Sequence, residues 1–452
     1  MSVELQTYSI PERLERLPVS GFHKKMWLII ATAWFFDSID LAMLTFVLGS
    51  VKLEFALSSV QTGLVAGASF LGMVFGASFS GMLGDKFGRR VVLQWSIVLW
   101  GLASASIYFV PSYSMLLVLR FALGLGMGME FPVAQSLLAE LMPARVRGRY
   151  IGYMEGGWPL GFVAAGIVSY LLMPIIGWRG IFLVEAIPAL FVLVIRRALT
   201  ESPRWLADVG RKEESNRVMA NIEEKVKKSL GLTELPQPIS DATLIVTHEQ
   251  RASFAELWTH AYVKRTIMLW TLWFTVLLGY YGLTSWIGVL LQNAGYTVAQ
   301  SVGFVLIMAL SGIPGFFVTA LLLDKLGRKR LLIFFLLAAA VAAYLYGTAA
   351  SLTWVLVFGS LLWYCQLSFW TCMYTWTPEL YPTRARATGC GFASGVGRIG
   401  SVIGPYLVAV IIPVFGTAGV FTMGAIAFVT AAFAVGILGV ETKGRVLEEI
   451  SK

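Results

Sequence analysis

The sequence has 452 residues, of which 57% are hydrophobic and only 13% charged. Ordinary soluble domains carry about 25% charged residues, so this chain has too few charges to cover a soluble surface, and lipid must surround much of it. Its formal net charge of +9 would suit a nucleic-acid-binding protein, but the positions of the charges argue against that class.

Apolar runs of about 20 residues are long enough to cross a bilayer as helices. Backbone groups in lipid must be hydrogen-bonded internally, which helices achieve segment by segment, and the alternating pattern of barrel strands is absent. We therefore predict an all-α polytopic membrane protein with twelve transmembrane helices. In chain order the predicted spans are 27–49, 60–83, 91–110, 114–138, 149–173, 179–197, 265–290, 300–322, 331–349, 353–376, 388–412 and 418–440.

Basic residues gather in every second short loop between these spans. The alternate loops hold little beyond Lys52 and Arg179. This positive-inside pattern predicts that both termini and the long central loop are cytoplasmic. Residues 1–25 are polar and the first apolar run is long, so no cleavable signal peptide is expected. The basic loop residues are Lys86, Arg89, Arg90, Arg145, Arg147, Arg149, Lys325, Arg328, Lys329, Arg330, Arg384 and Arg386.

Two motifs recur at one fixed offset. The segment that begins at Asp85 returns at Asp324, and the segment that begins at Glu140 returns at Glu379, both 239 residues later. A shared register of this kind indicates an internal repeat. We predict two six-helix bundles, 27–197 and 264–440, joined by a cytoplasmic linker with short helices at 198–263. Cytoplasmic tails would occupy 1–26 and 441–452.

Nothing in the sequence resembles an enzyme active site. The cysteines, Cys365, Cys372 and Cys390, lie in apolar helix sequence and have no metal or disulfide spacing. The histidines of the linker, His248 and His260, are isolated. We therefore expect no catalytic residue, no metal and no cofactor.

Several motifs resemble those of the major facilitator superfamily. Gly81–Arg90 (GMLGDKFGRR) resembles its loop signature between helices two and three, and Arg120–Gly128 (RFALGLGMG) its fourth-helix motif. Glu201–Leu206 (ESPRWL) and Glu441–Gly444 (ETKG) resemble signatures of the sugar-porter branch. The resemblance covers essentially the whole chain. It implies a transporter of twelve helices that works by alternating access, usually as a monomer.

Within the superfamily, the chain is similar to the synaptic-vesicle glycoprotein relatives and to bacterial niacin transporters. This likeness rests on Phe36–Asp40 (FDSID), Phe46–Leu48 (FVL), Tyr280–Trp286 (YYGLTSW) and Pro378–Arg384 (PELYPTR). It implies a small aromatic carboxylate such as nicotinate as substrate, whereas neighbouring branches carry organic cations.

Charged residues at membrane depth predict the proton-coupling site, because each costs about 2.5–3.5 kcal/mol at a helix centre. Asp37 and Asp40 are three residues apart on helix one and share a face. Arg120 on helix four would pair with whichever aspartate is ionised, and the sequence does not choose between the two. A purely structural ion pair is the alternative. Glu130 and Glu155 would either brace the cytoplasmic gate or face the cavity.

The repeated loop motifs predict a cytoplasmic gate. Salt bridges there would hold one conformation and release in the other, as alternating access requires. Its predicted members are Asp85, Arg89, Arg90, Glu140 and Arg147 in the first half, with Asp324, Arg328, Glu379 and Arg386 in the second.

Aromatic and amide side chains predict the substrate-binding cavity. Gln366, Trp370 and Tyr374 form one stripe of helix ten, and planar rings with polar handles suit a planar substrate. The resemblance to the synaptic-vesicle relatives also places Trp370 and Tyr374 in a ligand cavity, together with Tyr280 and Tyr281. The further predicted contacts are Trp286 on helix seven and Tyr153 and Trp158 on helix five.

Arg398 stands alone among glycines in helix eleven. A guanidinium at membrane depth needs an anion, and arginine suits bidentate recognition of a carboxylate. Arg398 therefore favours an anionic aromatic substrate, with a salt bridge to Asp37 or Asp40 as the alternative.

Together these features predict a proton-coupled importer of an aromatic carboxylate in a cell membrane, the inner membrane if the source is bacterial. Its partners would be the substrate, protons and lipid, without nucleic acid. The alternatives are an exporter of cations or drugs, a sugar or other organic solute symporter, a passive facilitator, and a membrane sensor that retains the fold.

Overall fold

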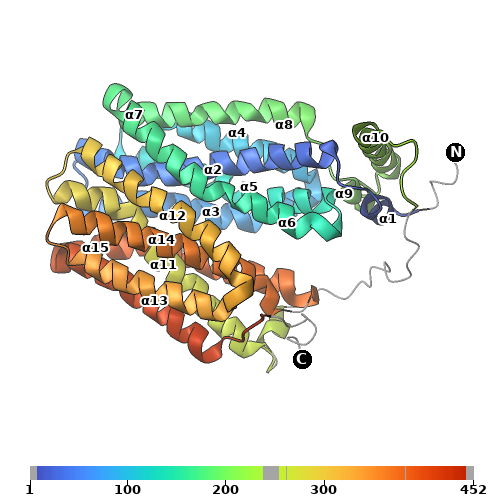
Figure 1. Ribbon diagram of the computed structural model, residues 1–452. Helices are drawn as coiled ribbons and strands as arrows, with labels where there is room; N and C mark the ends of the chain where they lie inside the picture. Colours follow the sequence, from blue (N-terminus) through green and yellow to red (C-terminus); the bar gives the residue numbers. More distant parts are fainter. Residues whose placement is uncertain (1–7, 238–253, 261, 382, 444–452) are drawn as a thin grey trace.

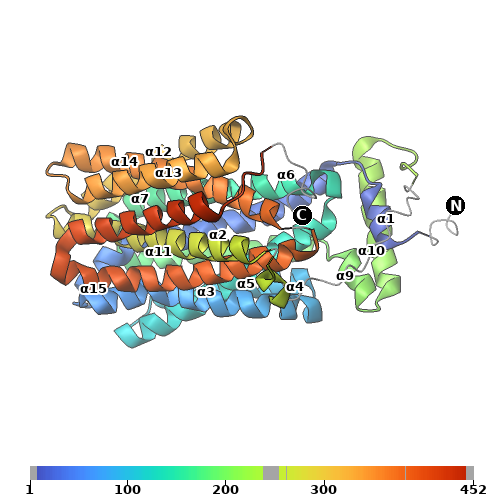
Figure 2. The same ribbon diagram turned by 90° about the horizontal axis from the view of Figure 1, so that it is seen from below.

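The protein is described here by a computed structural model that covers residues 8–237, 254–260, 262–381 and 383–443. Within these ranges the chain forms helices and no strand. Two helical bundles lie side by side, with the first half of the chain in one and the second half in the other (Figures 1 and 2).

The first bundle begins with a 34-residue helix, Gly21–Glu54. Ser58 and Ser112 cap the next spans by accepting hydrogen bonds from backbone N–H groups, which satisfies donors that a helix start leaves free. Its helices are α2 (Gly21–Glu54), α3 (Ser59–Phe87), α4 (Arg89–Ile107), α5 (Tyr113–Leu141), α6 (Ala144–Glu155), α7 (Gly157–Ala186), the 3₁₀ helix η2 (Ile187–Phe191) and α8 (Val192–Ala198).

The second bundle repeats this order. Thr297 caps its second span as Ser58 caps that of the first bundle. Its helices are α11 (Val263–Asn293), α12 (Val298–Leu326), α13 (Arg328–Gly347), α14 (Leu352–Trp376), the 3₁₀ helix η5 (Thr377–Leu380) and α15 (Thr383–Leu438).

Ten helical stretches in the described residues are long and apolar enough to cross a membrane. Two of them, Tyr150–Ala198 and Thr388–Leu438, each contain a glycine with a positive φ, Gly177 at 68° and Gly416 at 60°. Such a residue breaks the helix, since only glycine adopts this region at little cost. Each of these stretches therefore holds two spans, in agreement with the predicted fold of twelve helices.

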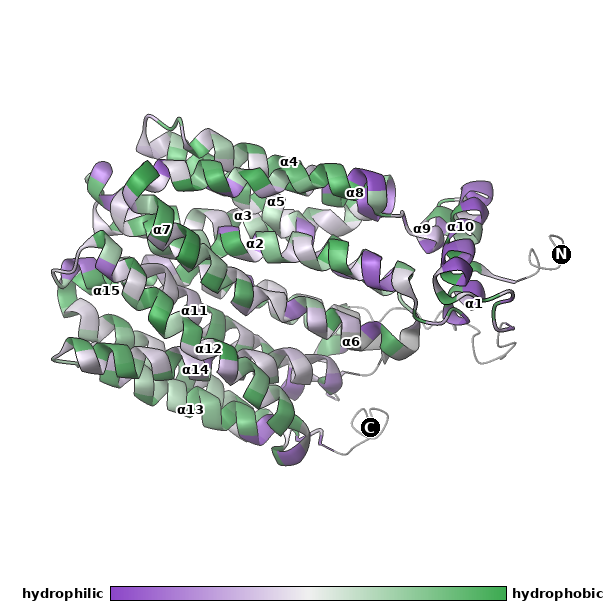
Figure 3. Ribbon diagram, turned by 45° about the horizontal axis from the view of Figure 1, so that its top comes forward, coloured by the Kyte–Doolittle hydropathy of each residue, from purple (hydrophilic) through white to green (hydrophobic). Residues whose placement is uncertain are grey.

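Short helices of the tail and linker lie beyond one end of the first bundle (Figure 1). They are α1 (Ile10–Glu15), α9 (Pro203–Asp208) and α10 (Lys212–Leu230). We call this end of the molecule the linker end and the opposite end the loop end. Hydrophilic residues gather on α1 and α10, whereas the long helices are largely hydrophobic (Figure 3).

A buried ion-pair cluster attaches α1 to α10. Arg13 and Arg16 both donate to the carboxylate of Glu223, at 2.7 and 2.6 Å. Burial alone would raise the pKa of Glu223, but the hydrogen bonds and charges of the two arginines outweigh it and hold that pKa below its usual value of 4.5. The N-terminal helix is thus docked on the linker by charge-assisted hydrogen bonds.

The two bundles approach most closely at the loop end. A Cβ atom at Gly49 would lie 2.2 Å from the Gln292 amide, and one at Gly63 would lie 2.9 Å from the carbonyl oxygen of Pro405. Toward the linker end the facing surfaces separate, since Tyr374, near the linker end of α14, is 39% exposed. No salt bridge joins the two bundles among the described residues. The space between them is therefore closed at the loop end and open at the linker end.

Glycines allow α3 and α5 to pack backbone against backbone. A Cβ atom at Gly124 would lie 1.9 Å from the carbonyl oxygen of Ser69, and the Ser69 hydroxyl donates to the carbonyl of Arg120 at 2.9 Å. Small residues permit this approach between membrane helices. The contact fixes the position of the segment of α5 that carries Arg120.

Substituting Gly124→Ala is expected to destabilise the protein by about 1–3 kcal/mol or more, because the backbone of α3 would have to move. The measurement is thermal unfolding of purified protein in detergent, followed by size-exclusion chromatography. Gly81→Ala is the matched control, since a Cβ atom there meets nothing within 4 Å. Equal stability of the two variants would contradict the close α3–α5 packing.

Candidate functional site

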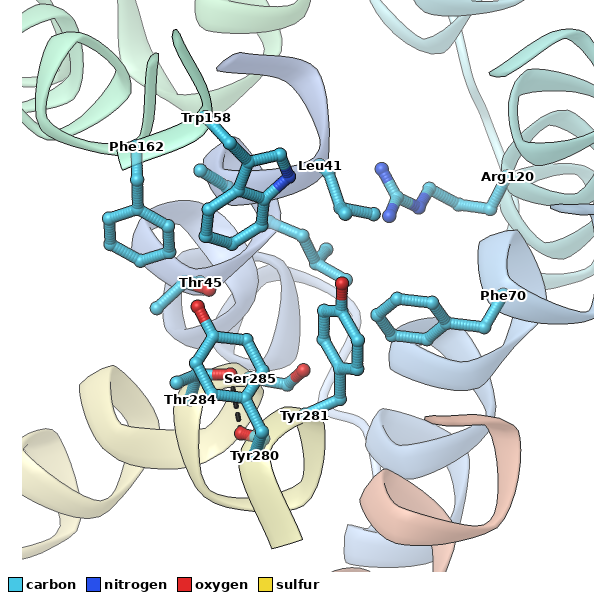
Figure 4. A pocket seen from close by; sticks show the side chains of 12 residues that line it. Leu41, Thr45, Phe70, Arg120, Trp158, Phe162, Tyr280, Tyr281, Thr284 and Ser285 are labelled. Carbon is cyan, nitrogen blue, oxygen red and sulfur yellow. Dashed lines mark hydrogen bonds between the residues drawn. The ribbon is translucent and has the colours of Figure 1, made fainter. Parts of the chain in front are cut away.

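A pocket lies in the middle of the molecule between the two bundles. Figure 4 shows the hydroxyl groups of Tyr280 and Tyr281, on α11, pointing toward Leu41, Thr45 and Trp158 of the first bundle. The pocket is lined by Leu41, Ala42, Leu44, Thr45, Phe70, Arg120, Trp158, Phe162, Tyr280, Tyr281, Thr284 and Ser285. The sequence predicted four of these: Arg120, Trp158, Tyr280 and Tyr281.

Aromatic contacts across the interface form the body of the pocket. The ring of Phe70 lies 4.4 Å from that of Tyr281, and the ring of Trp158 lies 6.1 Å from that of Tyr280. Both are centroid distances, the first at the short limit of about 4.5 Å for favourable aromatic pairs and the second well inside their range. Both bundles therefore contribute to one site, as alternating access around a midplane site requires.

Three aromatic residues extend this site toward the linker end. Trp370 and Tyr374 on α14 are stacked, with centroids 5.2 Å apart and planes inclined by 23°. Trp273 on α11 meets both edge-on, at 6.1 and 5.7 Å. We call Trp273, Trp370 and Tyr374 the aromatic wall. Sequence reasoning missed Trp273, because nothing distinguishes it from the other aromatic residues of α11.

Arg398 lies beside this wall. Its positive charge acts on the hydroxyl groups of Tyr281 and Tyr374. Across the interface it faces Asp37 and Glu155, which attract it electrostatically. No carboxylate oxygen of a described residue lies within the 4 Å of a salt bridge to Arg398. The alternative of a direct ion pair with Asp37 or Asp40 is thus not formed in this conformation.

Asp40 and Arg120 form the centre of a buried polar group in the first bundle. Asp40 interacts with Arg120 and with Glu185, and Arg120 interacts with both carboxylates. The Ser104 hydroxyl lies 3.5 Å from a Glu185 oxygen. Sequence reasoning missed Glu185, which follows the turn at Gly177 in an apolar run. Its signal was a single acidic residue at membrane depth.

Asp37 and Glu130 lie next to this group. Glu130 is fully buried and accepts a hydrogen bond of 3.0 Å from the indole of Trp100. Asp37 interacts with Glu130, Asp40 and Arg398. We call Asp37, Asp40, Glu130 and Glu185 the acidic cluster. Its four buried carboxyl groups outnumber the single buried guanidinium of Arg120 among the described residues of the spans.

Six of the nine predicted substrate contacts lie outside the pocket lining, and two of these six, Trp286 and Tyr153, pack elsewhere in the molecule. The indole of Trp286 is buried and donates to the carbonyl oxygen of Pro405 at 3.0 Å, so it joins α11 to α15. Tyr153 is 60% exposed, and its ring packs against Trp27 and Tyr150. Neither side chain is brought to the cavity in this conformation.

The predicted gate residues form ion pairs inside each bundle. Arg89 contacts Asp85 at 2.8 Å and Glu140 at 3.2 Å. In the second bundle, Arg328 contacts Glu379 at 3.3 Å. The repeat in the sequence is therefore a repeat of side-chain contacts. The side chains of Asp324 and Arg386, also predicted for this gate, lie outside the described residues.

The remaining gate arginines contact the tail and the linker. The backbone N–H of Arg90 donates to Glu201 at 3.2 Å, and its guanidinium donates to the carbonyl of Arg196. Arg147 contacts Glu15 of α1 at 3.3 Å. No sequence pattern indicates the last pair, whose residues are 132 positions apart.

The chain is similar in sequence to several known transport proteins. The chain is 37% identical to the niacin transporter NiaP of Acinetobacter baylyi over 97% of this chain and 98% of that protein. It is 33% identical to the putative niacin/nicotinamide transporter NiaP of Bacillus subtilis, over 95% and 99%. It is 28% identical to the synaptic vesicle 2-related protein of Xenopus laevis, over 98% and 83%.

Solved structures show the same fold. A partially occluded inward open conformation of the xylose transporter XylE from E. coli aligns with a TM-score of 0.76 at 19% identity, over 94% of this chain and 100% of that chain. The family model of the major facilitator superfamily matches residues 30–364 and 317–449. The chain is thus a multi-pass membrane transporter, not an enzyme, and belongs to the major facilitator superfamily.

Proposed function

We propose that this transporter imports a small aromatic carboxylate such as nicotinate, coupled to protons, by alternating access. Its linker end would face the cytoplasm, because the basic loops gather there. Relatives named as niacin transporters support the choice of substrate, and a relative named as an inner membrane transport protein supports that location.

Arg398 beside the aromatic wall is the observation that carries the substrate assignment. A half-buried guanidinium without a salt bridge to the described residues can bind a carboxylate bidentately. The stacked rings of Trp370 and Tyr374 offer a planar surface to an aromatic ring. An organic cation would meet repulsion from Arg398, so this arrangement favours import of an anion over export of cations.

The acidic cluster supports proton coupling. Four carboxylates and one guanidinium cannot all be charged in a low-dielectric interior, where an unpaired charge is strongly unfavourable. Some of these carboxyl groups must therefore bind protons. Asp37 is the link to the substrate, since its charge acts on Arg398. A proton on Asp37 would leave the guanidinium free to attract the substrate carboxylate.

The gate pairs complete the proposed cycle. With the space between the bundles open at the linker end, Arg89 and Arg328 hold partners within their own bundles. Closing that end would bring the two sets together and allow pairs to form across the interface. Such an exchange of partners between two states is the bistable element that alternating access needs.

The test is uptake of radiolabelled nicotinate into proteoliposomes, with and without an inward proton gradient. Symport of one proton with one monovalent anion gives about tenfold accumulation for each unit of pH difference, since a tenfold ratio corresponds to about 1.4 kcal/mol. We expect gradient-driven uptake by the wild type and its loss in Arg398→Ala.

The matched control is Arg330→Ala, because Arg330 is an exposed arginine at the linker end, outside the cavity. This variant is expected to transport like the wild type. Absence of nicotinate uptake by the wild type under both conditions would refute the substrate assignment. Equal uptake with and without the gradient would instead indicate that the protein is a passive facilitator.

A further inference from the structure

Three buried polar side chains near the aromatic wall have hydrogen-bonding atoms without partners among the described residues. They are the amide nitrogen and oxygen of Gln366, the indole nitrogen of Trp370 and the hydroxyl oxygen of Tyr280. Their residues are only 1%, 8% and 1% exposed. Leaving a buried polar group without a hydrogen bond is unfavourable, so three such groups close together indicate a common binding partner.

These groups share one surface. The ring of Tyr280 lies 5.5 Å from that of Trp370 and 6.4 Å from that of Trp363, both on α14. Gln366 lies between these two tryptophans, three residues after one and four before the other, so all three lie on the same helix face. Gln366 therefore lies on the face of α14 that meets α11 at Tyr280, whose hydroxyl group points into the pocket (Figure 4).

The same rings connect this group to the site of the carboxylate. Trp370 is stacked on Tyr374, and the charge of Arg398 acts on the hydroxyl group of Tyr374. Tyr280 adjoins Tyr281, with ring centroids 5.0 Å apart, and Tyr281 interacts with Arg398. One end of the site thus offers a guanidinium, and the other offers neutral hydrogen-bond donors and one amide acceptor, with aromatic rings between them.

We propose that Gln366, with Trp370 and Tyr280, forms a subsite that binds a hydrogen-bonding heteroatom on the aromatic ring of the substrate. This inference rests on the proposed function and narrows it. The preferred substrates are aromatic acids whose ring carries such an atom, a ring nitrogen or a ring hydroxyl group. A plain benzoate ring would leave the three polar groups buried and unpaired, so the transporter discriminates against it.

The experiment measures displacement of radiolabelled nicotinate from the purified protein by unlabelled nicotinate, 3-hydroxybenzoate and benzoate. One lost hydrogen bond in a buried site is worth about 1.4 kcal/mol, which is about tenfold in affinity. We expect nicotinate or 3-hydroxybenzoate, or both, to bind at least about tenfold more tightly than benzoate. If nicotinate binds more tightly than 3-hydroxybenzoate, the subsite prefers a ring nitrogen; if it binds less tightly, the subsite prefers a ring hydroxyl group.

Gln366→Leu is the diagnostic variant, because it keeps a similar side-chain volume and removes both hydrogen-bonding functions. It is measured with radiolabelled benzoate as well as nicotinate. We expect the affinity ratio between the preferred acid, nicotinate or 3-hydroxybenzoate, and benzoate to fall to about one, through loss of affinity for the preferred acid with benzoate affinity unchanged. Gln94→Leu is the matched control, since it removes another amide with an unpartnered nitrogen, on α4, away from the pocket lining.

Equal affinity of the wild type for all three acids would overturn the subsite while leaving carboxylate import in place. An unchanged preference in Gln366→Leu would do the same. If the wild type binds none of the acids, both the subsite and the proposed function fail. Comparison with Arg398→Ala separates the two ends of the site, because that variant should lose affinity for all three acids in equal measure.

Discussion

Arg120→Met is expected to reduce nicotinate transport by at least about 100-fold, in gradient-driven uptake and in exchange alike. Arg120 is 1% exposed and interacts with Asp40 and Glu185. These carboxylates act on the guanidinium through their charges, without a salt bridge within 4 Å. Removing a buried compensating charge still costs several kcal/mol, because it leaves the opposite charge uncompensated. The variant would therefore force additional protons onto the acidic cluster and lock its charge state.

The measurement needs a control for folding, because the same loss of charge balance can unfold the protein. Arg120→Met combined with Glu185→Gln removes one positive and one negative charge together. We expect this double variant to recover the thermal stability of the wild type in detergent without recovering transport. Arg120→Lys keeps the charge and is expected to retain partial activity. Full transport by the double variant would show that Arg120 acts only as a structural ion.

The repeat made the fold and the equivalent ion-pair contacts of the two bundles predictable from sequence. Arg89 and Arg328 occupy equivalent places in the two motifs, and each contacts an acidic residue of its own bundle, Glu140 or Glu379. A fixed offset between motifs is a strong signal because it depends on spacing alone. The contact between Arg147 and Glu15 carries no such signal, since it depends on how the N-terminal tail folds back onto the first bundle.

The acidic cluster was predictable in part. Asp37, Asp40, Arg120 and Glu130 stand out because charged residues in apolar runs are few. The same rule applies to Glu185, a single acidic residue in an apolar run. Which of these groups meet is a matter of helix packing, and only the structure shows that Asp40 faces Arg120 and Glu185.

Aromatic residues show why the substrate site was harder to predict. Trp273 and Trp286 both lie on α11, yet the first belongs to the aromatic wall and the second binds the backbone of Pro405. The 3.6-residue period of a helix tells which residues share a face. It does not tell which face meets the cavity when the helix is apolar on all sides, as α11 is.

The sequence does not decide whether Asp37 or Asp40 couples proton to substrate. The two aspartates have different neighbours in the structure, and we expect their variants to differ in nicotinate affinity. Asp40 faces Arg120 and Glu185, whereas Asp37 faces Arg398 across the interface. Asp37→Asn removes a negative charge that competes with the substrate carboxylate for the guanidinium. At pH 8 it should therefore bind nicotinate about tenfold more tightly than the wild type. Asp40→Asn should leave that affinity nearly unchanged.

The sign of the pH dependence follows from linkage between proton and substrate. If a proton on Asp37 favours binding of the anion, then bound anion favours that proton by the same factor. Wild-type affinity for nicotinate should fall as the pH rises from 6 to 8, a range in which the nicotinate carboxylate stays ionised. Asp37→Asn should show a flat profile, and it should exchange nicotinate across the membrane without accumulating it. A pH-independent wild type, or an Asp37→Asn variant that still accumulates nicotinate against its gradient, would exclude Asp37 as the residue that couples proton to substrate.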